Sequence, residues 1–88
     1  MVRVIDIDWS SASMEHIARH AVKPDEVEDV VYGDHYSTRA RDGMYRFTGQ
    51  TVSGRYLTVI LVPRGGGLFG VVTARDATTV ERRSFRKR

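Results

Sequence analysis

The chain has 88 residues, of which 41% are hydrophobic and 28% charged, with a net charge of +3 and an isoelectric point near 9.7. This length suits one domain with a single core, so we expect residues 1–88 to form one domain. No apolar run is long enough to span a bilayer, the first residues lack the features of a signal peptide, and the absence of cysteine excludes disulfides, zinc–thiolate sites and a thiol nucleophile. We therefore expect a cytoplasmic protein whose basic charge suits an anionic partner, either nucleic acid or an acidic protein.

The first third of the chain predicts one strand and two helices. Alternation over residues 2–9 indicates a strand, and its charges place it at a sheet edge. An amphipathic helix over about residues 12–21 follows, whose apolar face is formed by Met14, Ile17, Ala18 and Ala21. Pro24 suits the first position of a second helix, which has acids in its first turn and ends at Gly33. The outer face of this second helix is acidic and therefore a poor place for phosphate.

The rest of the chain has an apolar period of two, which predicts four strands, over residues 35–40, 44–51, 55–62 and 68–75. The run 55–62 is apolar on both faces in its second half, so we expect it at the sheet centre. Alternation places Arg46 on a polar strand face with Thr48 and Gln50. In the last strand, alternation places four side chains on one side, namely Phe69, Val71, Thr73 and Arg75.

The chain ends in a predicted basic helix. Thr78 and Glu81 have the spacing of a capping box, so a helix should begin at Thr78 and run to the end. Residues 75–88 contain six of the Lys and Arg residues and two acids, a local charge of +4. Either a solvated basic tail or a phosphate-binding helix fits this composition. The predicted fold is α+β, in the order β-α-α-β-β-β-β-α. In it, an antiparallel meander sheet carries two N-terminal helices on one face and a short basic C-terminal helix.

Several side chains are candidates for chemistry. Arg46 and Arg75 would bind a phosphate and stabilise developing charge if their strands bring them together, or each would be a surface arginine paired with an acid. His16 and His20 share one helix face, and they fit solvent-exposed residues, a metal pair, or a general acid or base at His20. Glu81 is the capping partner of Thr78, and a catalytic role would require its release from that bond.

Segments along nearly the whole chain resemble the BrnT-like toxins, small bacterial ribonucleases with a RelE-like fold. The ending Ala74-Arg75, then Glu81-Arg82-Arg83 and the aromatic Phe85, is similar to the closing segment of that family. Weaker similarity extends to Asp8-Trp9, His16–Val22, Pro24–Asp34, Tyr45–Gly49 and Ser53-Gly54-Arg55. At four positions the chain departs from the family: His16 replaces an asparagine, Arg19 a lysine, Ala21 a glycine and Phe85 a tyrosine.

The resemblance implies the toxin of a type II toxin–antitoxin system, a hydrolase that cleaves RNA without a metal or other cofactor. It implies RNA as substrate and a DNA-binding antitoxin as partner, and a dimer in complex with the antitoxin is compatible with it. The site residues that it implies are His20, Arg46, Arg75, Glu81 and Arg82. His20 would move a proton, Arg46 and Arg75 would neutralise the scissile phosphate, and Arg82 would hold neighbouring backbone.

A non-enzymatic basic module that binds RNA or a protein is the alternative hypothesis. A second family of small β-rich domains of unknown function shares the histidine-bearing helix and the general layout. Enzymatic activity therefore stays open at the level of the sequence, with an endoribonuclease as the favoured hypothesis.

Overall fold

The computed structural model describes residues 2–88. In chain order the elements are β1 (Asp6–Asp8), α1 (Ser11–Ala18), α2 (Pro24–Tyr32), β2 (His35–Arg39), the short 3₁₀ helix η1 (Arg41–Gly43), β3 (Tyr45–Gln50), β4 (Tyr56–Gly65), β5 (Leu68–Asp76) and α3 (Thr79–Lys87). The fold is α+β with the predicted order of helices and strands. None of the helices within residues 2–88 is both long and apolar enough to cross a membrane.

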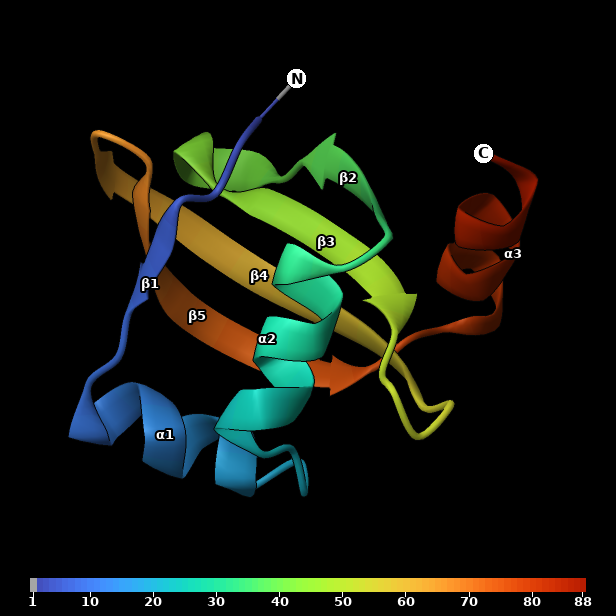
Figure 1. Ribbon diagram of the computed structural model, residues 1–88, viewed down its shortest axis with the longest axis horizontal. Coiled ribbons are helices and arrows are strands. Elements are labelled where there is room, and N and C mark those ends of the chain that lie inside the picture. Colours follow the sequence, from blue (N-terminus) through green and yellow to red (C-terminus); the bar gives the residue numbers. More distant parts are fainter. Residues whose placement is uncertain (1) are drawn as a thin grey trace.

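The strands form one sheet in the order β1-β5-β4-β3-β2, with β4 at the centre and β1 at an edge, as predicted (Figure 1). Strands β2 to β5 form an antiparallel meander. The first strand differs from the prediction, because β1 pairs with β5 in parallel and makes the sheet mixed. The helices and strands that separate β1 from β5 in the chain permit this parallel pairing, which a tight hairpin cannot make.

The first strand is also shorter than its sequence pattern predicts, since β1 spans only Asp6–Asp8. Its partner β5 begins at Leu68, which pairs with Asp6, so residues before Asp6 have no strand residue opposite them in the described chain. The Gly67 carbonyl accepts a hydrogen bond from the Ile5 amide at 2.8 Å. A Cβ on Gly67 would lie 2.7 Å from Ile5 Cγ1, so this close approach requires glycine.

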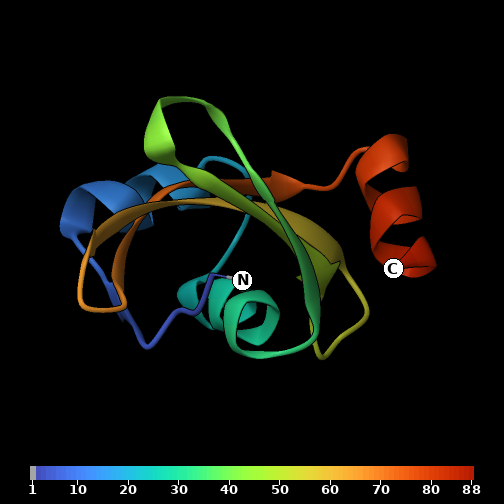
Figure 2. The ribbon, with the colours of Figure 1, turned by 90° about the horizontal axis from the view of Figure 1, so that it is seen from above.

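Helices α1 and α2 bury side chains in one core on one face of the sheet. α2 lies across that face, against β3 and β4, whereas α1 contacts β5 (Figures 1 and 2). The largest fully buried apolar side chains are Ile17 of α1, Val27 and Val30 of α2, and Phe47, Leu57, Val59 and Leu61 of the sheet. α3 lies on the opposite side of the sheet, near the strand ends (Figure 2). We call the sheet face that carries α3 the open face.

A β-bulge at Val72 decides which side chains of β5 reach the open face. Ile60 pairs with Thr73 but Leu61 pairs with Val71, so Val72 is an extra residue in the ladder. Phe69 and Val71 enter the core before the bulge, and Ala74 enters it afterwards. The prediction that Phe69, Val71, Thr73 and Arg75 share one side is therefore wrong. The bulge moves Thr73 and Arg75 onto the open face, because one added residue reverses the alternation.

The first helix is shorter than predicted and ends in a tight turn. α1 ends at Ala18, not at residue 21, and the Val22 amide donates to the Ile17 carbonyl at 3.1 Å. This 6→1 bond requires a left-handed residue just past the helix, and Ala21 supplies it with a φ of 56°. The turn buries Val22 and directs the chain into α2.

Candidate functional site

The N-terminus of α3 brings a carboxylate onto the open face of the sheet. Thr78 is the N-cap of α3, and the predicted capping box forms, since the Thr78 amide donates to Glu81 Oε1 at 2.9 Å. The same carboxylate accepts two bonds from Arg75, with Nη1 to Oε1 at 2.8 Å and Nη2 to Oε2 at 3.0 Å. The buried hydroxyl of Thr58, on the central strand, donates to Oε1 at 2.8 Å. Glu81 is thus held by a helix cap, a neighbouring strand and an arginine at once.

Arg46 reaches the same carboxylate from the other side. Its Nε lies 3.7 Å from Glu81 Oε2, and its Nη1 donates weakly to Thr38 Oγ1 at 3.4 Å. The Arg46 Nε is buried and has no hydrogen-bond partner among residues 2–88. Arg46 and Arg75 belong to β3 and β5, which are separated by β4, so their strands are not direct neighbours. The structure nevertheless brings the two guanidiniums together, at Glu81. We call Arg46, Arg75 and Glu81 the arginine–glutamate cluster.

The charges of this cluster are fixed near neutral pH. The hydrogen bonds from Arg75 lower the pKa of Glu81 from 4.5 to about 2, and this effect outweighs burial, which raises the pKa. The two arginine side chains are 39% and 36% exposed, whereas Glu81 is 16% exposed. Glu81 is therefore ionised, and the cluster carries one net positive charge on a face that solvent reaches. It can hold an anion only in competition with, or alongside, its own carboxylate.

The acid next to Arg75 in the sequence does not compete for its side chain. The carboxylate of Asp76 accepts from Arg55 Nε at 2.9 Å, and only the backbone carbonyl of Asp76 contacts Arg75. Arg55 also donates to the carbonyls of Ala21 at 2.6 Å and His20 at 3.1 Å. Two consecutive residues of β5 thus make contacts on opposite sides of the sheet: Arg75 contacts α3, and Asp76 binds Arg55, which contacts the turn after α1.

A groove of about 460 Å³ lies beside the cluster on the open face. The hairpin of β2, η1 and β3 rises on this side of the sheet (Figure 2). The groove runs from this hairpin to β5, and it is lined by Arg39, Arg41, Arg46, Ile60, Val72 and Thr73, among others. Arg46 also borders a smaller cavity of about 180 Å³ beneath α3, so it forms a wall common to both spaces. Cationic side chains on the rim suit the phosphate of a nucleotide, and the apolar floor suits its base.

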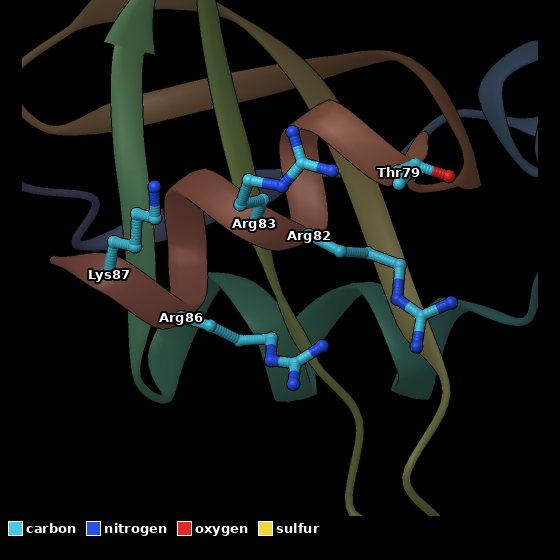
Figure 3. A pocket seen from close by; sticks show the side chains of 5 residues that line it. All are labelled: Thr79, Arg82, Arg83, Arg86 and Lys87. Atoms are coloured by element: carbon cyan, nitrogen blue, oxygen red, sulfur yellow. The ribbon is translucent and has the colours of Figure 1, made fainter.

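The outer side of α3 is strongly basic. Arg82, Arg83, Arg86 and Lys87 are exposed and line one hollow with Thr79 (Figure 3). The guanidinium of Arg82 lies 4.4 Å above the ring of Tyr56, a cation–π contact that directs it away from the arginine–glutamate cluster. Phe85 is the only buried residue of α3, and its ring lies 6.1 Å from that of Tyr56. The helix is ordered against the sheet, with its charges available to a polyanion.

The predicted proton-transfer residue lies apart from the cluster. His20 follows the end of α1 and is exposed; its ring lies 5.7 Å from the ring of His16. No hydrogen bond or ion pair within residues 2–88 joins the His20 side chain to Arg46, Arg75 or Glu81. No group of three or more His, Asp or Glu side chains in the described chain is placed to hold a metal.

Two contributions to the open face were not predicted from the sequence. His16 reaches Thr73, and its Nε2 lies 3.1 Å from Thr73 Oγ1, at the β5 side of the groove. The spacing of His16 and His20 marked the pair, but it did not show which ring faces the sheet. Arg39 and Arg41 form the opposite rim of the groove. In the sequence, only their positive charges near a predicted turn pointed to these two arginines.

The fold is similar to that of a solved ribonuclease toxin. The crystal structure of the Brucella abortus ribonuclease toxin BrnT, determined at 1.1 Å, superposes with a TM-score of 0.70 at 19% sequence identity, covering 86% of this chain and 100% of that chain. The resemblance to BrnT is thus confirmed at the level of the fold. The sequence matches no protein-family model and no curated protein.

Proposed function

We propose that the chain is the toxin of a type II toxin–antitoxin system, an endoribonuclease that cleaves RNA in the cytoplasm without a metal ion. Two findings support this proposal: the likeness of the fold to a ribonuclease toxin, and the meeting of Arg46 and Arg75 beside a groove on the open face. The second carries more weight, because a shared fold alone does not imply a shared activity.

In this proposal the arginines and the glutamate of the predicted site have defined roles. Arg46 and Arg75 bind the scissile phosphate and stabilise the charge that develops on it, since guanidinium forms paired hydrogen bonds with phosphate oxygens. Glu81 fixes the orientation of Arg75 through its two-point ion pair. Arg82 contacts the backbone of neighbouring nucleotides. A histidine imidazole moves the proton: the resemblance points to His20, and His16 is the other imidazole of this segment.

The antitoxin partner is part of the same proposal. The exposed arginines of α3 and the arginine-lined groove are two basic surfaces, which an inhibitory protein would have to cover or neutralise. A DNA-binding antitoxin with an acidic docking segment fits this requirement.

Cleavage of RNA by the purified chain tests the proposal. The wild-type chain should cleave mRNA in the presence of EDTA, and Arg75→Ala should reduce kcat/KM by about 100-fold or more, a loss typical when a charge-stabilising group is removed. Lys23→Ala removes a cation from the N-cap of the acidic helix α2 and serves as the matched control. If Arg75→Ala cleaves RNA as fast as the wild-type chain, Arg75 has no role in the mechanism.

A second candidate function is a non-enzymatic RNA-binding module, which the position of Glu81 favours. Its carboxylate already occupies the space between the two guanidiniums, as a bound phosphate would. This function predicts salt-sensitive RNA affinity with no turnover. Growth arrest on expression, relieved by Arg75→Ala, supports the toxin; harmless expression with intact RNA binding supports the module.

A further inference from the structure

A row of side chains crosses the open face and ends at His16. The strand register pairs Thr38 with Arg46, Arg46 with Ile60, and Ile60 with Thr73. Neighbouring strands are about 4.8 Å apart, so Thr73 lies on the order of 10 Å from Arg46 across the sheet. The His16 Nε2 is 3.1 Å from the Thr73 hydroxyl. The groove therefore has an arginine at one wall and an imidazole just behind its other wall.

We propose that His16, and not His20, is the imidazole that takes the proton from the 2′-hydroxyl during RNA cleavage, with the nucleotide bound in the groove between His16 and Arg46. This inference rests on the proposed ribonuclease function and names a catalytic residue for it. At this position the chain departs from the family that it resembles, which has an asparagine there.

The surroundings of the two histidines differ in the way that this role requires. His16 lies within α1, is half-buried and is held by Thr73, so its ring has a fixed position at the groove. His20 lies in the turn after α1, is exposed, and is anchored through its carbonyl to Arg55. A general base must be fixed within hydrogen-bond reach of the proton that it removes. Thr73 fixes the ring of His16 beside the groove, whereas no hydrogen bond within residues 2–88 fixes the ring of His20.

The groove has the size and lining to place a ribose beside His16. Its volume of about 460 Å³ is within the range of about 300–1,000 Å³ usual for ligand pockets. Arg39 and Arg41 stand on the rim, where they can contact phosphates, and Ile60 and Val72 offer an apolar surface for a base. A ribose hydroxyl that enters at Thr73 would replace the threonine hydroxyl as the partner of His16 Nε2.

The reaction balances with this one imidazole. The 2′-hydroxyl proton passes to the neutral His16 Nε2, and the 2′-oxygen forms a bond to phosphorus. The bond from phosphorus to the 5′-oxygen breaks, and that oxygen takes a proton from water. The resulting hydroxide removes the proton from the His16 imidazolium. The products are a 2′,3′-cyclic phosphate and a 5′-hydroxyl, with the charge on the phosphate neutralised by Arg46 and Arg75.

Matched alanine variants of the two histidines test the inference. Single-turnover cleavage of a defined RNA should fall about 100-fold or more in His16→Ala, a loss typical for a general base, and by less than about 3-fold in His20→Ala. Affinity for the same RNA with 2′-O-methyl riboses, which cannot be cleaved, should be unchanged in both variants. Added imidazole should restore part of the activity of His16→Ala, an effect that a purely structural role would not produce. His16→Gln, which keeps the size of the side chain, should be as inactive as His16→Ala.

The contrary results are distinct. If His20→Ala is inactive while His16→Ala and His16→Gln cleave at near wild-type rates, the inference fails and the ribonuclease proposal stands. The inference also fails if His16→Gln retains wild-type activity. A wild-type chain that binds RNA but never cleaves it overturns both proposals together.

Discussion

Glu81 and Arg75 form a two-point ion pair, with distances of 2.8 and 3.0 Å, although one belongs to α3 and the other to β5. The same carboxylate caps the first turn of α3 and accepts the Thr58 hydroxyl. One side chain therefore fixes the start of a helix, orients an arginine and sets the charge of the site. The docking of α3 depends strongly on this polar contact, because Phe85 is the only buried residue of the helix.

The first prediction concerns stability at low pH. The pKa of Glu81 is about 2 in the folded chain, below its ordinary value of 4.5. A depressed pKa contributes stability that is fully present above about pH 4.5 and is lost as the pH falls toward 2. The contribution is on the order of 3 kcal/mol at most. Urea unfolding should show wild type more stable than Glu81→Gln at pH 6, with the difference shrinking between pH 4.5 and 2. Glu15→Gln, at an exposed carboxylate of α1, is the control; a constant difference for Glu81→Gln would contradict the prediction.

The second prediction concerns the buried threonine beneath the cluster. Thr58 is fully buried and bonds both Glu81 and, at 2.9 Å, the Thr48 hydroxyl. Thr58→Val removes the hydrogen-bond partner of the buried Thr48 hydroxyl and one of the bonds to Glu81, and should lower the free energy of unfolding by about 1–3 kcal/mol. It should also raise the pKa of Glu81, because one hydrogen bond to the charged form is lost. NMR titration of Glu81 measures this shift. Thr58→Ser keeps the hydroxyl and should leave that pKa in place; an equal shift in both variants would exclude the hydroxyl as its cause.

The third prediction concerns the turn after α1. Ala21 has a φ of 56°, a conformation that glycine adopts without the steric cost of a Cβ. Ala21→Gly should therefore raise the free energy of unfolding by about 0.5–1 kcal/mol, measured by denaturant unfolding. Ala12→Gly, at an exposed position inside α1, should lower it by a similar amount. Destabilisation by both substitutions would show that the turn does not strain Ala21.

The fourth prediction concerns α3 and the salt dependence of RNA binding. If Arg82 contacts phosphate, Arg82→Gln should reduce the slope of log affinity against log salt by about 0.7, the value for one lost contact to a single strand. The effect should be similar for unrelated RNA sequences, because phosphate contacts carry no base information. Lys23→Gln makes the same change of charge on the acidic helix α2. An unchanged slope for Arg82→Gln would remove Arg82 from the RNA interface.

Local patterns in the sequence predicted most of the architecture. The capping box of Thr78 and Glu81, the central position of β4 and the edge position of β1 follow from spacing and composition, and all three are present. The polar face of β3, with Arg46 and Thr48, was also predictable, because β3 pairs with both neighbouring strands without a bulge and its side chains alternate regularly. Each of these features depends on residues close together in the chain.

Features that depend on distant contacts were not predictable. The bulge at Val72 leaves no mark in a run of apolar residues, so the facing of Thr73 and Arg75 was wrongly predicted. The parallel pairing of β1 depends on a partner some sixty positions away, at Leu68. The contact of His16 with Thr73 arises only once α1 lies beside β5. The ion pair of Glu81 with Arg75 was also not predictable, because the capping box alone explains the spacing of Thr78 and Glu81.

The opposite orientation of Arg75 and Asp76 has a mechanical consequence. Arg75 holds α3 through Glu81, and Asp76 holds Arg55, which in turn grips the carbonyls at the end of α1. The last two residues of β5 therefore connect α3 on one side of the sheet to the end of α1 on the other side. We therefore expect a force that pulls α3 away to act, through β5, on the turn that carries His20.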